Sequence, residues 1–271
     1  MLSFKVLGPL EVIHGTQYRT PTAPRVLTTL ALLVVRANHV VGMNTLIDEL
    51  WGDGPPRSAA TTAQTYVYQL RRLIDDLEAA DAGPAGKQVL LTVAPGYLLR
   101  VNPDQIDAHR FERLTAEGQR LLEEGRPARA AEVLRAALAM WDGAPLANVR
   151  GGRALSGFAA ALHEQHGRAL DLRITADLAL GRHHQLVPEL RALIAEHPFN
   201  EWYHSLLVFT LGSVGRRRDA LDAYRNARRT LSEELGLEPS AELNRIQAAV
   251  LQNRTVSPPS GSTFSSDART A

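Results

Sequence analysis

A run of polar side chains between Ser58 and Asp76 can donate hydrogen bonds without carrying negative charge. The stretch reads SAATTAQTYVYQLRRLIDD, and no acidic residue precedes Asp75 in it. Hydroxyl, amide and guanidinium groups donate to phosphate oxygens and to base edges, arginine pairing with guanine and glutamine with adenine. An ordinary surface helix carries Glu and Lys on its outer face, so this composition favours contact with a polyanion. The side chains concerned are Thr61, Gln64, Thr65, Tyr68, Arg71 and Arg72.

The same stretch has the spacing of a single helix with two faces. At 100° per residue, its apolar side chains fall on one arc and its polar ones on the other. Ser58 follows the helix-breaking pair Pro55-Pro56 and is suited to accept hydrogen bonds from the first free backbone amides. A polar face that merely lacks acids would look the same, so the interpretation depends on the flanking elements. The apolar arc holds Ala63, Tyr66, Val67, Leu70, Leu73 and Ile74.

Catalytic and metal-binding chemistries find little support in the sequence. There is no cysteine, which excludes a disulfide framework, a thiol nucleophile and a Cys-ligated metal. No glycine-rich phosphate-binding motif and no nucleophile-elbow motif occurs. His163 and His166 are three residues apart, which departs from the His-Glu-x-x-His spacing of zinc helices, and His183-His184 is expected to be solvated. We therefore expect no enzymatic activity, no metal and no cofactor.

Composition describes a globular chain without a strong bulk charge. The 271 residues carry 30 Lys and Arg against 29 Asp and Glu, a net charge of +1. Any nucleic-acid binding must therefore come from a local patch of charge. No apolar run approaches the ~20 residues of a membrane span, and the N-terminus MLSFKVLGPLEV does not have the pattern of a secretory signal. We expect a cytoplasmic protein with no membrane contact.

The elements predicted around this helix are a small sheet, two further helices and a hairpin. Alternating apolar residues predict strands at the N-terminus, and an apolar run over about 24–36 predicts a buried helix. A helix MNTLIDELW then ends at Gly52, and VLLTVAPGYLLRV reads as a hairpin turning at Ala94-Pro95-Gly96. Three helices followed by a hairpin is the order of a winged helix-turn-helix, whose third helix enters the major groove.

Several segments resemble the Streptomyces antibiotic regulatory protein family. FKVLGPLEV, LIDELWGDGPP, TTAQTYVYQLRRLI and TVAPGYLLRV are similar to its DNA-binding domain, an OmpR/PhoB-type winged helix. ALAMWDGAPLANV, ADLALGRH and EELGLEPS resemble the bacterial transcriptional activation domain that follows it, so the resemblance covers about residues 2–252. It implies a pathway-specific activator of secondary-metabolite or antibiotic genes, which binds direct repeats as two or more protomers and recruits RNA polymerase with its sigma factor.

Candidate DNA-contacting residues follow from both lines of reasoning. On the third helix we assign base contact or close groove approach to Thr61, Thr62, Thr65, Tyr68, Gln69 and Arg71, and phosphate contact to Arg72. Thr92 and Tyr97 flank the hairpin turn and are expected to reach the DNA backbone, while Arg25 and Trp51 are weaker phosphate-side candidates. Gln69 could be a solvated flank and Trp51 could be packed under the loop. The loop Asp53-Gly54-Pro55-Pro56 occupies the position that faces polymerase in the family, or is a rigid turn.

The second half predicts an all-α region with degenerate tetratricopeptide-like repeats. Gly-Arg turns occur at Gly125, Gly181 and Gly215, and the last two are one tetratricopeptide period apart. Stacked helix pairs of this kind leave a groove suited to peptides or proteins; a plain helical bundle is the alternative. We predict a winged helix over 1–102, an activation domain over 103–252 and a disordered tail over 253–271.

The sequence as a whole predicts a mainly α, sequence-specific DNA-binding transcriptional activator. Its partners would be double-stranded DNA and RNA polymerase holoenzyme. The competing interpretation is a tetratricopeptide-like adaptor without sequence-specific DNA binding, which the near-neutral charge favours.

Overall fold

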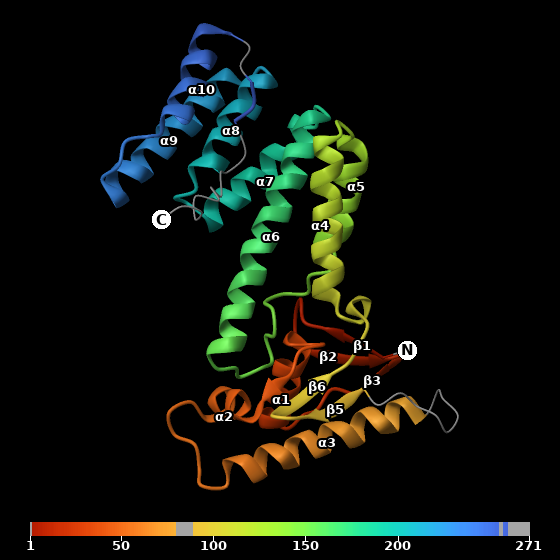
Figure 1. The fold of residues 1–271 in the computed structure, drawn as a ribbon. Helices are drawn as coiled ribbons and strands as arrows, with labels where there is room; N and C mark the ends of the chain where they lie inside the picture. The colour runs from red at the N-terminus through yellow and green to blue at the C-terminus, as the bar shows by residue number, and fades with distance from the viewer. Residues whose placement is uncertain (1, 80–88, 255–256, 260–271) are drawn as a thin grey trace, which may run out of the picture. The chain divides into compact units, whose positions relative to one another are not determined.

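The computed structural model describes residues 2–79, 89–254 and 257–259 of the chain, without the side chains of residues 78 and 79. The predicted mainly α fold is confirmed, with small antiparallel sheets near the N-terminus (Figure 1). The chain divides into two compact units. Unit 1 comprises Met1–Glu117 and Val133–Ala169, and unit 2 comprises Gly118–Glu132 and Leu170–Ala271.

The N-terminal sheet of unit 1 is an antiparallel meander. Strands β1 (Leu2–Lys5), β2 (Glu11–His14) and β3 (Gln17–Tyr18) pair in the order β1-β2-β3, with Phe4 opposite Val12. The alternation of the sequence is realised, because Phe4 and Val12 are buried while Lys5 is exposed. One face of the sheet therefore belongs to the core of the unit.

Three helices follow, at the places where the sequence predicts them. They are α1 (Pro24–Val35), α2 (Met43–Trp51) and α3 (Ala59–Ala79). Nine successive residues of α1, 26–34, are buried, so it is the central helix of the unit. Helix α2 ends at Gly52, whose φ of 57° suits a residue without a β-carbon.

The predicted hairpin forms a second sheet. Strands β4 (Val41–Gly42), β5 (Leu90–Val93) and β6 (Gly96–Leu99) are antiparallel in the order β4-β6-β5. A β-carbon on Gly96 would lie 1.9 Å from the carbonyl oxygen of Val41. Only glycine permits this approach, which fixes the turn end of the hairpin against β4, just before α2.

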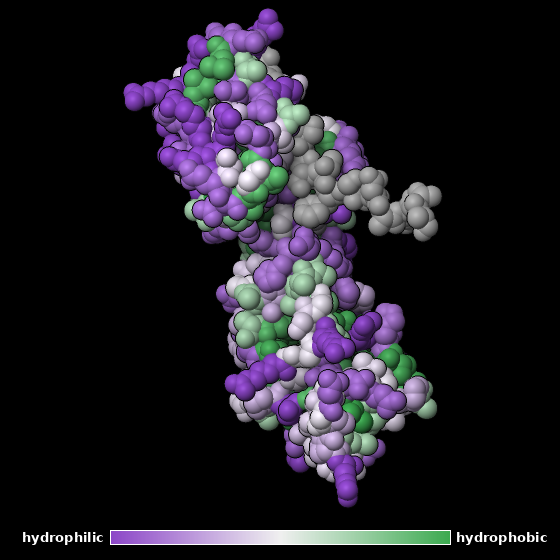
Figure 2. Space-filling model, turned by 90° about the vertical axis from the view of Figure 1, so that its left-hand side faces the viewer, coloured by the Kyte–Doolittle hydropathy of each residue, from purple (hydrophilic) through white to green (hydrophobic). Residues whose placement is uncertain are grey.

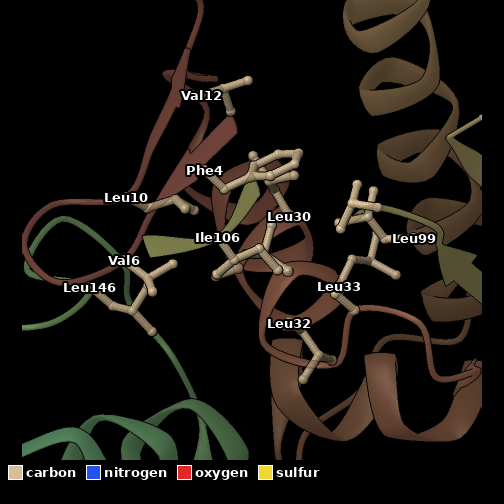
Figure 3. Packing of buried hydrophobic residues seen from close by; sticks show 14 of the residues in the cluster. Phe4, Val6, Leu10, Val12, Leu30, Leu32, Leu33, Leu99, Ile106 and Leu146 are labelled. Carbon is tan, nitrogen blue, oxygen red and sulfur yellow. The ribbon is translucent and has the colours of Figure 1, made fainter. Parts of the chain in front are cut away.

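Figure 3 shows that the core of unit 1 draws side chains from both halves of the sequence. Phe4 comes from β1, Leu30 from α1 and Leu99 from β6, whereas Ile106 and Leu146 lie beyond the hairpin. All are at most 5% exposed. The winged-helix elements therefore share one interior with residues that follow them in the chain.

Hydrogen bonds reinforce this shared core along the segment from Asp142 to Leu155. The side-chain amide of Asn148 bonds both backbone groups of Leu10, at 2.7 and 3.1 Å. The hydroxyl of Thr28 donates to the carbonyl of Arg150 at 3.0 Å. Buried Glu49 of α2 accepts from three backbone amides at the start of α6 (Arg153–Ala179): Gly152 at 2.6 Å, Ala154 at 2.9 Å and Leu155 at 3.1 Å.

The remaining elements are helical. After the short 3-10 turn η1 (Pro103–Gln105) come α4 (Asp107–Glu123), α5 (Pro127–Leu138), α6 (Arg153–Ala179), α7 (His183–Glu196), α8 (Glu201–Ser213), α9 (Arg217–Leu235) and α10 (Ala241–Gln252). The predicted glycine turns are confirmed, because Gly125, Gly181 and Gly215 all have φ between 68° and 78°. No helix of the described residues is long and apolar enough to span a bilayer.

Unit 2 is built around α8. Helix α8 packs against α7, α9 and α10 (Figure 1), and ten of its residues, 202–211, are buried. On α9, buried Ala220, Tyr224 and Ala227 have the predicted small–large–small spacing. Polar residues cover most of the face that Figure 2 shows, with separate apolar patches among them.

The boundaries of the compact units differ from those of the predicted domains, because unit 1 combines the N-terminal region with residues 133–169. The functional division at residue 102 stays a prediction. Of the predicted tail, residues 255–256 and 260–271 lie outside the described residues.

Candidate nucleic-acid interface

The outer face of α3 is exposed as its periodicity predicts. Thr61, Gln64, Thr65 and Gln69 are exposed, and Tyr68 is 58% exposed. On the inner face Ala63, Val67, Leu70 and Ile74 are at most 1% exposed. Burial of this apolar arc fixes the rotation of α3, so hydroxyl, amide and phenol groups form a ridge open to solvent.

The hairpin β5–β6 lies along one flank of this ridge. Arg71 of α3 donates from Nε to the carbonyl of Leu90 at 3.2 Å and from Nη2 to the hydroxyl of Thr92 at 3.1 Å. Both acceptors belong to β5. Arg71 therefore joins α3 to the hairpin and holds Thr92 of β5 beside the ridge.

The opposite flank borders the N-terminal sheet. A cleft of about 660 Å³ lies there, between α3 and the chain around β3. Its lining includes two guanidinium groups and two carboxamides, which are hydrogen-bond donors; Asp76 is the acid within it. The lining residues are Gln17, Arg19, Gln69, Arg72, Leu73, Asp76 and Leu77.

Gln17 and Arg19 are candidate site residues that the sequence analysis does not identify. Both are exposed, and Arg19 donates to Gln17 Oε1 at 3.4 Å. The signal in the sequence is the segment GTQYRT after His14, which is polar, basic and free of acids. Nothing in a local pattern indicates that it lies beside residues more than 50 positions further along the chain.

The candidates Arg25 and Trp51 form a stack with Tyr66. The guanidinium carbon of Arg25 lies 5.7 Å from the Trp51 ring centre, and the Trp51 and Tyr66 rings lie 6.4 Å apart at 22°. The stack links the first turn of α1 to α2 and α3. Trp51 is half-buried and Arg25 exposed, so the tryptophan holds the arginine at the surface through a cation–π contact.

Electrostatics on this side favour an anion. The first turns of α1 and α3 contain no acidic residue, and no side chain caps the N-terminus of α1. Free backbone amides and the positive end of a helix dipole attract phosphate groups. Arg57 and Arg72 are exposed and add positive charge to the surface of α3 and of the loop before it.

The loop between α2 and α3 is an exposed turn. Residues 52–58 are all exposed, and the amide of Gly54 donates to the carbonyl of Trp51 at 3.3 Å. Pro55 and Pro56 restrict the backbone of the loop. It therefore presents a defined shape to solvent, with Asp53 as its acidic group.

Tyr97 differs from its predicted position at the tip of the wing. Its side chain is only 8% exposed and belongs to the core of unit 1. It pairs with Thr92 across the hairpin and with Val41 of β4. Strand β4 pairs with the edge of β6 that a free two-stranded wing would leave open, and the sequence pattern does not reveal this strand pairing.

The two histidine pairs contact aromatic side chains. His163 and His166 lie against Trp141, with ring centres 6.2 and 4.5 Å from it, and burial lowers the pKa of His166. His183 is half-buried beside Phe209, in contrast to the expected solvated side chain. Among the described residues, no group of three or more His, Cys, Asp or Glu side chains is arranged to hold a metal ion.

Comparison with known proteins agrees with this architecture. Residues 106–251 match the bacterial transcriptional activator domain, and residues 19–99 match the C-terminal domain of transcriptional regulatory proteins. The chain is 42% identical to the regulatory protein DnrI of Streptomyces peucetius over 93% of this chain and 92% of that protein. It is 35% identical to the transcriptional regulator RedD of Streptomyces coelicolor, over 92% and 70%.

A solved structure of Mycobacterium tuberculosis EmbR, in complex with a low-affinity phosphopeptide, superimposes with a TM-score of 0.86. It is 32% identical, and the match covers 95% of this chain and 66% of that one. The winged-helix region and the helical region that follows it thus both have counterparts in a related regulator. The chain belongs to the Streptomyces antibiotic regulatory protein family of DNA-binding transcriptional activators.

Proposed function

We propose that the protein is a sequence-specific activator that inserts α3 into the DNA major groove near promoters. The carrying observation is the exposed, acid-free ridge of α3, which has donor-bearing elements on both flanks. The major groove of B-DNA is ~12 Å wide and admits one helix. Elements on either side of that helix then face the two phosphate backbones that border the groove.

The residues divide by the kind of contact their positions allow. Thr61, Thr62, Thr65, Tyr68 and Gln69 would approach bases from the ridge. Arg72 would contact phosphates, as would Arg25 and Trp51. We extend this phosphate-contacting set to Arg19, because it lines the same cleft as Arg72.

Arg71 combines two roles in this proposal. Its bonds to Leu90 and Thr92 use two of five guanidinium N–H groups. The other three remain able to donate to DNA, either to a guanine, as the sequence predicts, or to a phosphate. Thr92 and the hairpin tip would contact the backbone beside it, with Tyr97 supporting the hairpin from the core.

Activation would come from protein contacts outside the groove. The exposed loop Asp53-Gly54-Pro55-Pro56 would face RNA polymerase and its sigma factor, and the helical region would supply further protein contacts. Two or more protomers would lie side by side on direct repeats. The family resemblance and the regulators DnrI and RedD support a pathway-specific role in secondary-metabolite or antibiotic biosynthesis, exercised in the cytoplasm.

Fluorescence anisotropy over a salt series tests the DNA-binding part. The probes are promoter fragments from the gene neighbourhood and random DNA of equal length. Gln69→Ala should weaken binding to the preferred fragment by ~1–3 kcal/mol and leave random DNA nearly unaffected. Arg72→Ala should weaken both and lower the salt slope by about 1. Arg218→Ala is the matched control, since its side chain is 93% exposed and lies in unit 2.

The adaptor alternative rests on the net charge of +1. It predicts that no fragment binds more tightly than random DNA, and that the Gln69, Arg72 and Arg218 variants behave alike. That result would reject the activator proposal and direct attention to protein partners of the helical region.

A further inference from the structure

A cavity of about 540 Å³ lies within unit 2, where the ends of four helices meet. Helix α7 contributes its first residue, His183, and α9 contributes its first residue, Arg217. Asn253 and Arg254 enter the lining from the chain just after α10. A volume of ~300–1,000 Å³ is typical of ligand sites. The rest of the lining is Phe209, Gly212, Ser213, Ala249 and Val250.

The described lining of this cavity is basic and contains no acid. Arg217 donates from Nε to the carbonyl of Val250 at 3.2 Å and from Nη2 to that of Leu251 at 2.9 Å. It thereby satisfies carbonyls at the negative end of α10, and its other three N–H groups make no bond to the described residues. Arg254 is exposed, and its guanidinium forms no ion pair with the described residues, so its charge is uncompensated there.

His183 supplies an unsatisfied polar atom at the same place. Its Nδ1 is buried and has no hydrogen-bond partner among the described residues. Buried polar atoms are almost always paired, so an unpaired one indicates a missing partner such as a ligand or a water. The Phe209 ring contacts the imidazole edge at a centre distance of 5.9 Å and holds its orientation. Burial, and secondarily His184, lowers the pKa of His183, so the neutral ring has one N–H donor.

We propose that this cavity binds the carboxylate or phosphate group of an acidic ligand, with Arg217 and Arg254 neutralising its charge and His183 donating a hydrogen bond. Guanidinium groups form short, charge-assisted bonds to such oxygens. Phe209 and Val250 provide apolar contact for the carbon part of the ligand. The site lies in unit 2 and uses no residue assigned to DNA contact, so it stands or falls independently of the proposed function.

Isothermal titration calorimetry on the full chain tests the site, with citrate as the carboxylate probe and inorganic phosphate as the phosphate probe. We expect saturable binding of at least one probe at one site per chain. Arg254→Gln should weaken it roughly tenfold, the loss of one charged contact worth about 1.4 kcal/mol. Arg254 is exposed, so this substitution should leave the fold intact. His183→Phe, which keeps the ring contact with Phe209, should weaken binding severalfold.

Arg218→Gln is the control for diffuse charge. It removes the same charge one residue away from Arg217, from a side chain that is 93% exposed and does not line the cavity. Equal weakening by Arg254→Gln and Arg218→Gln would overturn the proposal. So would the absence of saturable heat for both probes up to about 10 mM, which would leave an ordered water as the partner of His183. Binding of citrate alone or of phosphate alone identifies the preferred group.

Discussion

The three hydrogen bonds that Glu49 accepts give the most direct energetic prediction. The residue is 7% exposed, and its carboxylate caps the N-terminus of α6, where backbone amides have no intrahelical acceptor. Glu49→Ala would leave these donors without a partner. An unsatisfied buried amide costs ~1–3 kcal/mol; the amide of Leu155 is buried, whereas Gly152 and Ala154 are half-buried. We therefore expect Glu49→Ala to lower the free energy of unfolding by roughly 3–5 kcal/mol.

Differential scanning calorimetry measures this loss. At ~2–4 °C per kcal/mol for a domain of this size, the transition of unit 1 should fall by about 6–20 °C. Glu49→Gln retains one acceptor oxygen and should lose about half as much. Asp48→Ala is the control, because Asp48 is the preceding residue of α2 and is exposed; exposed substitutions change stability by ~0.5 kcal/mol or less. If Glu49→Ala lowers the transition no further than Asp48→Ala does, the capping argument is refuted.

Further predictions concern the cleft beside α3, the turn end of the hairpin and a half-buried acid. Arg19→Ala should lower the salt slope of DNA binding by about 1 without changing base preference; an unchanged slope removes Arg19 from the interface. Gly96→Ala should destabilise unit 1 by roughly 3 kcal/mol in urea unfolding, since its β-carbon would overlap the Val41 carbonyl, and a wild-type midpoint would contradict that packing. Burial raises the pKa of Asp171 to about 6, opposed by the hydrogen bond from Tyr203. Its protonated form therefore stabilises the fold below pH 3.8, and this stabilisation is lost as pH rises through 6. Asp171→Asn should stabilise the fold by ~1–2 kcal/mol at pH 7.5, after allowance for solvent screening, and so raise the melting temperature there. At pH 4 the melting temperature should be nearly unchanged. Equal shifts of the melting temperature at both pH values would argue against titration of Asp171.

Local patterns in the sequence predict helices, strands and turns, but they do not predict contacts between residues far apart in the chain. The rotation of α3 follows from Val67, Leu70 and Ile74, because a single buried stripe decides which side faces solvent. The glycine turns of the helical region were equally predictable, since Gly181 and Gly215 need positive φ. These features depend on residues within one or two turns of each other.

The missed features depend on partners far apart in the chain. Tyr97 has the sequence environment of an exposed turn residue, but its side chain packs into the core of unit 1 and its strand pairs with β4. Arg19 gains a neighbour in Arg72 because the N-terminal sheet and α3 border the same cleft. His183 sits in an apparently polar His-His pair, yet α8 covers one side of its ring. Each would have required knowledge of tertiary pairing, which a single sequence does not contain.

The bonds from Leu10, Thr28 and Glu49 to the segment 148–155 bear on how proteins of this kind can be cut and recombined. A shortened chain ending at Asn102 would lack Ile106, Leu146 and Leu155, which complete the interior of the winged helix. It would expose apolar side chains and leave Glu49 as a charge without its amides. We therefore expect the winged helix to need the first half of α6 in order to fold stably. Recombination that exchanges DNA specificity between relatives should join sequences after this piece, and a breakpoint at the border between the two matched family ranges would yield an unstable hybrid.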